Sequence, residues 1–409
     1  MQHKLPGYNM LAVLIGGLSM VSPFSIDTFF PAFHAMERAL GVSAWQLQQV
    51  ITAYMVPFAF ASLVHGPLSD AIGRRPVMIA GMCLYTVGSI ACMLAPNYQF
   101  LIGARVLQGV SAGVGVVIGR AVIRDLYEGP RAQKLMAATT MIFSIAPAVA
   151  PIIGGWVHVA FGWRAVFAVM VICGLAFAFS AWWKLPETHA PANRIPFNAR
   201  NLVSTSWTVL RHPEFSMLAC AAAVNFSSLA CFIGSAPAIV EKHWHLGETS
   251  YWQLFLPVIS GILVGAVISN RIAGRMEMVA QVRIGIGLTF SVALLRVLLH
   301  LAFTDLPIAV QQGLLVVAAI GAQFAFPVLT LRMLDLFPAA RGTAASVQSF
   351  VALLVTAFTL GIVAPKVLPR LEWVATASLC CATLAAICWY LSRRWHVRHV
   401  LPAGAPPAA

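Results

Sequence analysis

The sequence predicts an all-α membrane protein with about twelve transmembrane helices in two six-helix bundles. Of its 409 residues, 60% are hydrophobic and only 10% are charged, whereas an average soluble domain is roughly 25% charged. The mean hydropathy is +0.83. Polar breaks separate the apolar runs, and a spanning helix needs roughly 20 apolar residues. The longest break, at about 186–212, divides the runs into two sets of six.

The apolar runs place the predicted helices in chain order. They cover 10–35, 46–68, 76–95, 99–122, 135–157, 163–184, 214–240, 251–269, 283–304, 307–331, 343–366 and 371–392. We therefore expect one bundle over 1–184, a cytoplasmic linker over 185–213, a second bundle over 214–392 and a cytoplasmic tail over 393–409.

The net charge of +13 reflects membrane topology rather than binding of nucleic acid. Lys and Arg concentrate in cytoplasmic loops of membrane proteins. If the N-terminus lies inside, most basic residues of the connecting segments fall on the cytoplasmic side. The outer segments then hold only Arg38, Arg164, Lys242, Lys366 and Arg370. We expect both termini in the cytoplasm, in a bacterial inner membrane, and no nucleic-acid partner.

Asp27 is the one acidic residue that falls well inside a predicted helix. A charged side chain there costs roughly 2.5–3.5 kcal/mol on insertion scales. Intramembrane acids usually face a cavity and work there, and removal from water favours the neutral carboxyl, so Asp27 is a candidate proton carrier. Pro23 and Pro31 flank it and would bend the helix. The alternative is a structural aspartate that bonds a neighbouring helix.

No pattern in the sequence indicates an enzyme, a metal site or an organic cofactor. The eight cysteines lie in apolar runs without metal-type spacing and are expected to act as small hydrophobic residues. His65 and His300 have no evident ligand partners at helical spacing. A membrane-embedded enzyme would need several converging polar groups, so it is the weaker interpretation.

The loop after the second predicted helix carries the most specific motif. It reads GPLSDAIGRRP, with Gly66, Asp70, Gly73, Arg74 and Arg75 at its fixed positions. This loop closely resembles the G-x-L-x-D-x-x-G-R-[RK] motif of the major facilitator superfamily, in which it latches the two halves in one state. Gly66 would allow close helix approach, and Gly73 would allow a tight turn. A weaker copy, SNRIAGR, occurs at 269–275 and suggests duplicated halves.

A second motif, R-x-x-Q-G, places Arg105 and Gln108 in the fourth predicted helix. The resemblance implies that this arginine takes part in proton transfer, and we expect Arg105 to modulate Asp27 when the two approach. The alternative is an arginine whose head group reaches the outer membrane interface.

A third motif, APAVAPIIGGW, lies in the fifth predicted helix and resembles the superfamily's antiporter motif through Pro147, Pro151, Gly154 and Gly155. The common form has Gly where this chain has Ala146. The form A-P-x-x-x-P-x-x-G-G is typical of the bicyclomycin and chloramphenicol/florfenicol resistance (Bcr/CflA) branch. Helix 1, with SIDTFFPA, resembles the same branch, although Thr28 and Phe29 replace Met and Tyr.

This resemblance implies a twelve-helix drug:proton antiporter that exports small amphipathic compounds by alternating access. Its energy source would be the proton gradient, and by family habit it would act as a monomer. The candidate substrate-contacting residues are polar or aromatic: Tyr54, Gln108, Asn225, Phe226, Trp252, Gln323 and Phe326. Each is also explained by helix packing or an interfacial aromatic belt.

The sequence also bears on the charge of the substrate and on one alternative function. If Arg120, Arg296 and His300 face the cavity, its potential would be positive apart from Asp27, which argues against dicationic substrates. The alternative function is a proton-coupled transporter of a metabolite or nutrient with the same fold, which the helix-5 motif disfavours.

Overall fold

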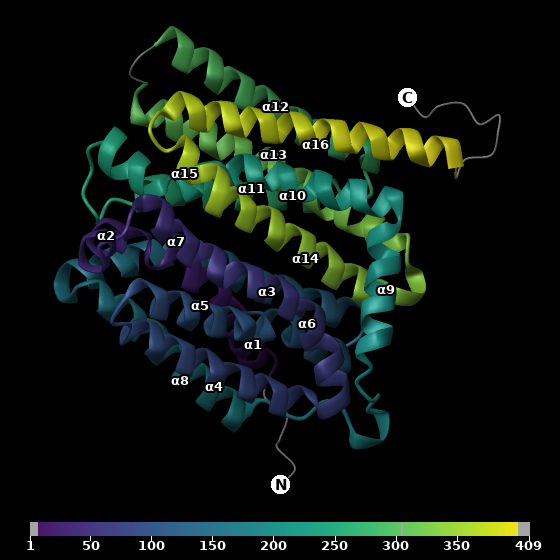
Figure 1. Cartoon of the computed structure of the whole chain (residues 1–409). Helices are drawn as coiled ribbons and strands as arrows, with labels where there is room; N and C mark the ends of the chain where they lie inside the picture. The colour runs from purple at the N-terminus through teal and green to yellow at the C-terminus, as the bar shows by residue number, and fades with distance from the viewer. Residues whose placement is uncertain (1–6, 304–305, 400–409) are drawn as a thin grey trace. The chain divides into compact units, whose positions relative to one another are not determined.

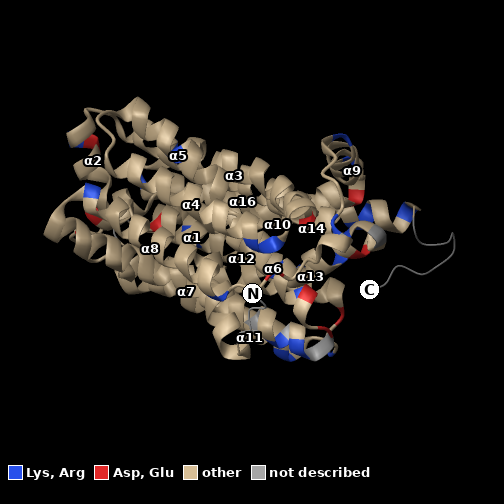
Figure 2. Cartoon of the chain, turned by 90° about the horizontal axis from the view of Figure 1, so that it is seen from below, with Lys and Arg blue, Asp and Glu red and all other residues tan. Residues whose placement is uncertain are grey.

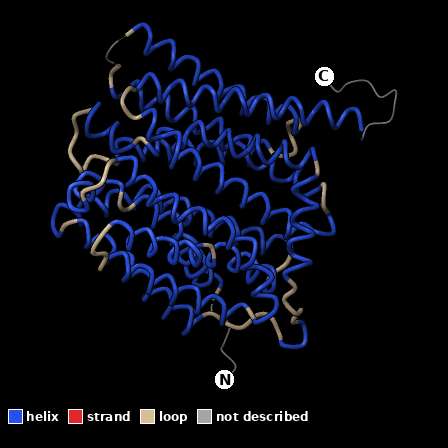
Figure 3. The backbone as a smooth tube through the Cα atoms, viewed as in Figure 1, coloured by secondary structure: helices blue, strands red, loops and turns tan. Residues whose placement is uncertain are grey.

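A computed structural model describes residues 7–303 and 306–399. Every regular element in these ranges is a helix (Figure 3). Within them, 12 helical segments are long and apolar enough to cross a membrane. Charged residues lie mostly near the helix ends (Figure 2). The predicted all-α, twelve-helix fold is confirmed, while Lys4, Asp305 and the tail beyond 399 lie outside the described residues.

The chain forms two compact units. The first runs as far as Leu202 and also takes in Ala236–Leu256, while the second comprises Val203–Ser235 and the chain from Pro257 onward. The expected linker, 185–213, contains a helix of its own, α9 (Ala199–Arg211). Its sequence is too polar to have been predicted as a spanning helix.

Six spans build the first unit, with α1 packed on α7, α3 on α5, and α4 on α8. The pair α4 and α8 lies side by side in Figure 1. The helices are α1 (Tyr8–Asp27), α2 (Phe33–Leu40), α3 (Ala44–Ile72), α4 (Arg74–Met93), α5 (Tyr98–Ala112), α6 (Val114–Leu126), α7 (Gly129–Phe161) and α8 (Trp163–Lys184).

The second unit is likewise a helical bundle, with α10 packed on α16 and α12 on α13. Its helices are α10 (Pro213–Gly234), most of α11 (Trp252–Ile272), α12 (Met278–Ala302), α13 (Ile308–Asp335), α14 (Arg341–Phe358), α15 (Ala364–Val367) and α16 (Leu371–His399). The connection between α10 and α11 holds the π-helical turn η3 (Ala238–His243) and folds with the first unit.

Two helices that the sequence predicts as continuous are interrupted. The first, expected over 10–35, ends at Asp27 and resumes as the short 3-10 turn η1 (Phe30–Ala32) and α2. Pro31 explains the break, because it has no N–H to donate to the carbonyl of Asp27. The fourth, expected over 99–122, divides at Gly113 into α5 and α6.

The weak repeat in the sequence has a structural counterpart. Ser69 accepts a hydrogen bond from Arg74 Nη1 (2.6 Å), and Ser269 accepts one from Gln281 Nε2 (2.7 Å). The following glycines both have left-handed backbones, with φ of 117° at Gly73 and 77° at Gly274. The second helix of each unit therefore ends in a comparable turn that favours glycine.

Candidate functional site

Asp27 is the last residue of α1 and is only 6% exposed. Within the described part of the chain, its carboxyl forms no hydrogen bond or ion pair. An ionised carboxylate without partners is strongly disfavoured in such surroundings, whereas the protonated acid is tolerated. This position therefore suits a carboxyl that gains and loses a proton as its surroundings change.

Arg105 lies on α5 and is completely buried. Its Nε donates to the carbonyl oxygen of Val50 (3.2 Å), and its Nη1 donates to the carbonyl of Ser25 (3.2 Å) and to Gln108 Oε1 (2.6 Å). The head group thus points into the unit rather than to an interface. It is tied to α1 two residues before Asp27.

Aromatic rings flank the same guanidinium. Its carbon lies 4.7 Å from the ring centre of Phe29 and 4.4 Å from that of Tyr54. Such cation–π contacts are strongest where water is excluded. Among the described residues, no ion pair joins Arg105 to Asp27. The two residues expected to interact therefore lie near the same end of α1 without direct contact.

Polar side chains of three helices continue this network towards α1. Tyr54, from α3, donates to the carbonyl of Ser22 (3.0 Å). Gln108, from α5, donates to Ser89 Oγ (2.8 Å) on α4. Tyr85, also from α4, is hydrogen-bonded to Ser25 of α1. The last two turns of α1 before Asp27 are therefore held by hydrogen bonds from its neighbours.

The motif glycines of α7 lie where that helix meets the end of α1. A Cβ added to Gly154 would stand 1.7 Å from the carbonyl oxygen of Thr28, the residue after Asp27. A Cβ at Gly155 would stand 2.6 Å from the carbonyl oxygen of Glu248. Only glycine permits these two close approaches. Pro147 and Pro151 lie inside α7, which remains a continuous helix.

The connection between α10 and α11 is attached to the first unit by polar contacts. Glu241 lies 2.8 Å from His34 Nδ1 and accepts a hydrogen bond from the Tyr251 hydroxyl (2.8 Å). Glu248 lies 3.3 Å from His158 Nε2 of α7. Burial and the nearby carboxylate of Glu241 raise the pKa of the Tyr251 phenol, so its hydroxyl stays protonated and able to donate.

The turn between α3 and α4 carries an ion-pair cluster. Arg74 contacts Asp70 Oδ1 (2.5 Å) and donates from Nε to Asp125 Oδ2 (3.1 Å) at the end of α6. Glu187, which follows α8, accepts from the backbone N–H groups of Arg74 (3.0 Å) and Arg75 (3.3 Å). This carboxylate therefore caps the N-terminus of α4.

The glycines of the same motif differ in their surroundings. Gly73 has the left-handed backbone expected of a tight turn. A Cβ at Gly66 would lie 3.7 Å from Val117, an ordinary contact distance, so the close approach expected of Gly66 is not seen within the first unit.

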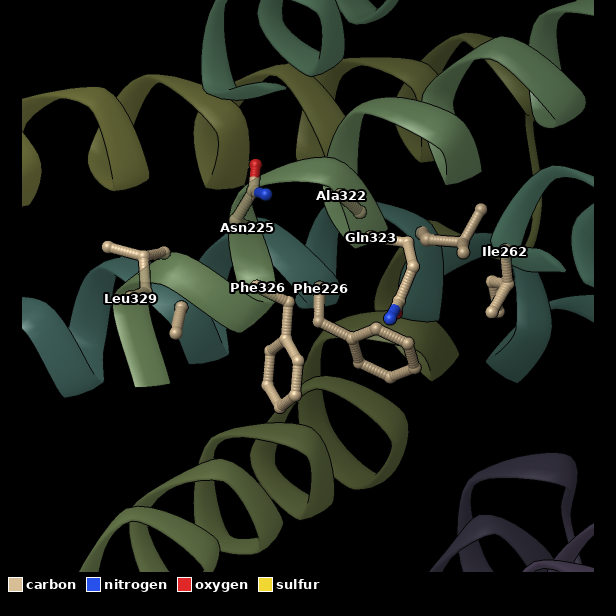
Figure 4. A pocket seen from close by; sticks show the side chains of 9 residues that line it. Asn225, Phe226, Ile262, Ala322, Gln323, Phe326 and Leu329 are labelled. Carbon is tan, nitrogen blue, oxygen red and sulfur yellow. The ribbon is translucent and has the colours of Figure 1, made fainter. Parts of the chain in front are cut away.

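A pocket opens in the second unit between α10, α11 and α13. The roughly 320 Å³ of empty space that it spans includes open surroundings, and the enclosed part is small. Its walls carry Asn225, Phe226, Gln323 and Phe326, with the Phe226 ring beside the Gln323 amide and the Phe326 ring next to Phe226 (Figure 4). The Asn225 amide oxygen is buried and has no hydrogen-bond partner in the described part of the structure.

Four of the seven residues proposed for substrate contact thus line one pocket. Of the others, Tyr54 and Gln108 belong to the Arg105 network of the first unit. Trp252 begins α11, is 45% exposed and does not line the pocket.

Several polar residues at these sites were missed by the sequence analysis. Ser22, Ser25, Tyr85 and Ser89 are common in spanning helices, and only their inward orientation makes them part of the network. The available signal in the sequence was that two serines, Ser22 and Ser25, lie three residues apart on the same predicted helix just before Asp27. Glu241 gave no signal, because it occurs in a connection whose folding partner the sequence does not specify.

Comparison with known proteins gives a consistent result. Residues 15–360 match the sequence profile of the Major Facilitator Superfamily. A bicyclomycin resistance protein homolog of Haemophilus influenzae is 28% identical over 300 residues, covering 72% of this chain and 75% of that protein. A chloramphenicol resistance protein of Pseudomonas aeruginosa is 27% identical, covering 69% and 67% respectively.

A solved structure is similar in fold. The human organic anion transporter MFSD10 superposes with a TM-score of 0.70 at 17% identity, covering 95% of this chain and all of that one. At this identity the likeness concerns the fold alone. The bacterial relatives fit the bicyclomycin and chloramphenicol resistance branch indicated by the motifs of α1 and α7.

Proposed function

The chain belongs to the Major Facilitator Superfamily and is a membrane transporter rather than an enzyme, and from this premise we propose that it is a drug:proton antiporter. It exports small amphipathic compounds from the bacterial cytoplasm. The observation that carries the proposal is Asp27, a buried carboxyl without a partner in the described residues, at a break in α1. The names of the relatives support a drug-like substrate.

The proposed cycle exchanges a proton for a substrate at the level of Asp27. Facing outward, Asp27 takes a proton from the periplasm. The transporter then turns inward, and the arriving substrate and Arg105 favour loss of that proton to the cytoplasm. The loaded form turns outward again, and reprotonation of Asp27 releases the substrate. The break at Thr28 and Phe29 provides the bend at which α1 moves during this cycle.

The surroundings of the site support this assignment of roles. Gly154 of α7 lies against the backbone carbonyl of Thr28, the residue after Asp27, so a shift between α1 and α7 would displace the end of α1 that carries this carboxyl. Arg105 of α5 donates to the carbonyls of Val50 and Ser25, so its charge is held close to the end of α1 that carries Asp27. The transporter needs no cofactor besides the proton gradient and works as a monomer in the inner membrane.

A growth-inhibition panel in an efflux-deficient bacterium tests the proposal. It compares wild type, Asp27→Asn and empty vector at matched expression, against amphenicols, bicyclomycin, sulfonamides and dyes. Asp335→Asn is the matched control, because Asp335 is exposed and pairs with Arg341 at the surface. We expect wild type and Asp335→Asn to protect against some compounds and Asp27→Asn to give no protection.

The other outcomes separate the alternatives. Equal protection by Asp27→Asn would make Asp27 structural and move the proton site elsewhere. Failure of wild type to protect against any compound would favour transport of a metabolite. Protection that survives collapse of the proton gradient would contradict coupling to protons.

A further inference from the structure

We propose that Arg296 sets the charge preference of the pocket in the second unit, so that the pocket accepts neutral or anionic aromatic compounds and rejects lipophilic cations. This inference rests on the proposed function and names the class of substrate that the pocket in the second unit would bind. It assigns a role to a buried arginine outside the superfamily motifs described above.

Arg296 is a buried cation with few compensating contacts. It lies on α12, is 3% exposed, and places its guanidinium 4.0 Å from the ring centre of Phe232. Its Nη2 is buried without a hydrogen-bond partner in the described part of the chain. Arg105 in the first unit also has a buried Nη2 without a partner among the described residues, but its Nε and Nη1 donate to three oxygen acceptors.

The described carboxylates of the second unit do not neutralise Arg296. Glu214 is occupied by Arg332 (3.4 Å) and His396 (3.0 Å) at the other end of α10. Asp335 pairs with Arg341 at the surface. The side chains of Glu277 and Glu372 are exposed to the surroundings of the unit. The interior of this unit therefore carries an unbalanced positive charge, which a buried anion would stabilise.

One stripe of α10 connects this charge to the pocket. Asn225, Leu229 and Phe232 follow one another at helical spacing and share a face. Asn225 and Leu229 line the pocket, and Phe232 lies against the Arg296 guanidinium. Seven residues of helix span roughly 10 Å, so the guanidinium lies about 10–15 Å from the Asn225 side of the pocket.

The charge is close enough to affect binding. At about 12 Å and an effective dielectric constant of about 20, Coulomb's law changes the affinity of a singly charged ligand by up to about tenfold. The polar groups lining the pocket are the uncharged amides of Asn225 and Gln323. The rings of Phe226 and Phe326 suit aromatic ligands and would by themselves also attract cations. Arg296 opposes that attraction.

Two ions of nearly the same shape and opposite charge test the inference. The binding of tetraphenylborate and tetraphenylphosphonium to the purified full-length transporter is measured in detergent, with protein-free micelles subtracted. The variants are Arg296→Gln, which removes the charge, and Arg296→Lys, which keeps it. Arg283→Gln is the matched control, since Arg283 is exposed on the same helix.

We expect wild type to bind the anion more tightly than the cation. Arg296→Gln should reduce that preference about tenfold or more, because the cation gains affinity and the anion loses it. Arg296→Lys and Arg283→Gln should retain the wild-type ratio, which a merely structural role of Arg296 would not predict. A cation that binds wild type as tightly as the anion overturns the inference without any variant, even if Arg296→Gln does not fold.

Other results bear separately on this inference and on the proposed function. An unchanged ratio in Arg296→Gln, with export intact, overturns the inference alone. If wild type shows no proton-driven export in the growth panel but Arg296→Gln shifts the ratio of anion to cation affinity as expected, the proposed function is overturned. The inference about the charge preference of the pocket then still holds. Failure of wild type to bind either ion overturns the inference.

Discussion

Asp27 and Arg105 are both buried in the first unit, yet their charges are satisfied to different degrees. Arg105 has three oxygen acceptors and two aromatic rings around it, so its charge is stabilised in place. Asp27 has no such partner within the described residues, and burial there favours its neutral form. The arginine is thus the fixed charge and the aspartate the group suited to exchange a proton.

Arg105→Lys tests whether the planar guanidinium, and not only its charge, is needed. Lysine has a single ammonium nitrogen. It therefore cannot donate in the planar geometry of the guanidinium to the carbonyls of Val50 and Ser25 and to Gln108 Oε1. We expect proton-driven export into inverted vesicles to fall at least tenfold while expression is retained. Export by Arg105→Lys at the wild-type rate would show that a positive charge alone is sufficient.

At the scale of residues, the sequence identified Asp27 and Arg105 as functional candidates but did not predict their hydrogen bonds. Asp27 was identifiable because it is an acid inside an apolar run, and Arg105 because it lies in a motif. The hydrogen bonds of Arg105 to Val50 and Ser25 use backbone carbonyls of other helices. They depend on how each helix is rotated in the bundle, which residue type and spacing do not specify.

At the scale of elements, the junction of α1 with α7 is the tightest feature of the candidate site. Gly154 lies so close to Thr28 that the two backbones touch. The sequence identified the glycines of α7 through the antiporter-like motif, but it placed Asp27 well inside a continuous helix. The structure ends α1 there because of Pro31, and local propensity does not indicate whether a membrane helix bends at a proline or breaks.

Gly154→Ala tests this junction. A methyl group there would overlap the carbonyl oxygen of Thr28, so we expect the free energy of unfolding to fall by about 1–3 kcal/mol. Thermal unfolding of the purified protein in detergent measures the change. Gly103→Ala on α5 is the matched control, because a Cβ at Gly103 has no neighbour within 4 Å. Equal stability of the two variants would contradict the close contact.

At the scale of the whole molecule, composition and hydropathy were sufficient to predict the fold class. The 12 membrane-length segments lie close to the predicted ranges, because each must present enough apolar length to cross the bilayer. The predicted domain limits did not foresee that Ala236–Leu256 folds with the first unit. Its attachment depends on contacts such as Glu241 with His34, between residues far apart in the sequence.

The distribution of basic residues predicts the orientation of the chain. We expect a fluorescent protein fused after residue 399 to fluoresce and alkaline phosphatase at the same point to be inactive, because the basic residues predict a cytoplasmic C-terminus. Fusions after Trp244, in the connection between α10 and α11, should give the opposite pattern. An active phosphatase at the C-terminus would contradict the predicted orientation.

The central claim is that Asp27 carries the proton that is exchanged for the substrate. Proton release on addition of substrate to the purified transporter, in weakly buffered solution, measures this most directly. With a compound that wild type exports, we predict release from wild type, and binding without release from Asp27→Asn. Equal proton release from both proteins would contradict the account, because the exchanged proton would then come from another group.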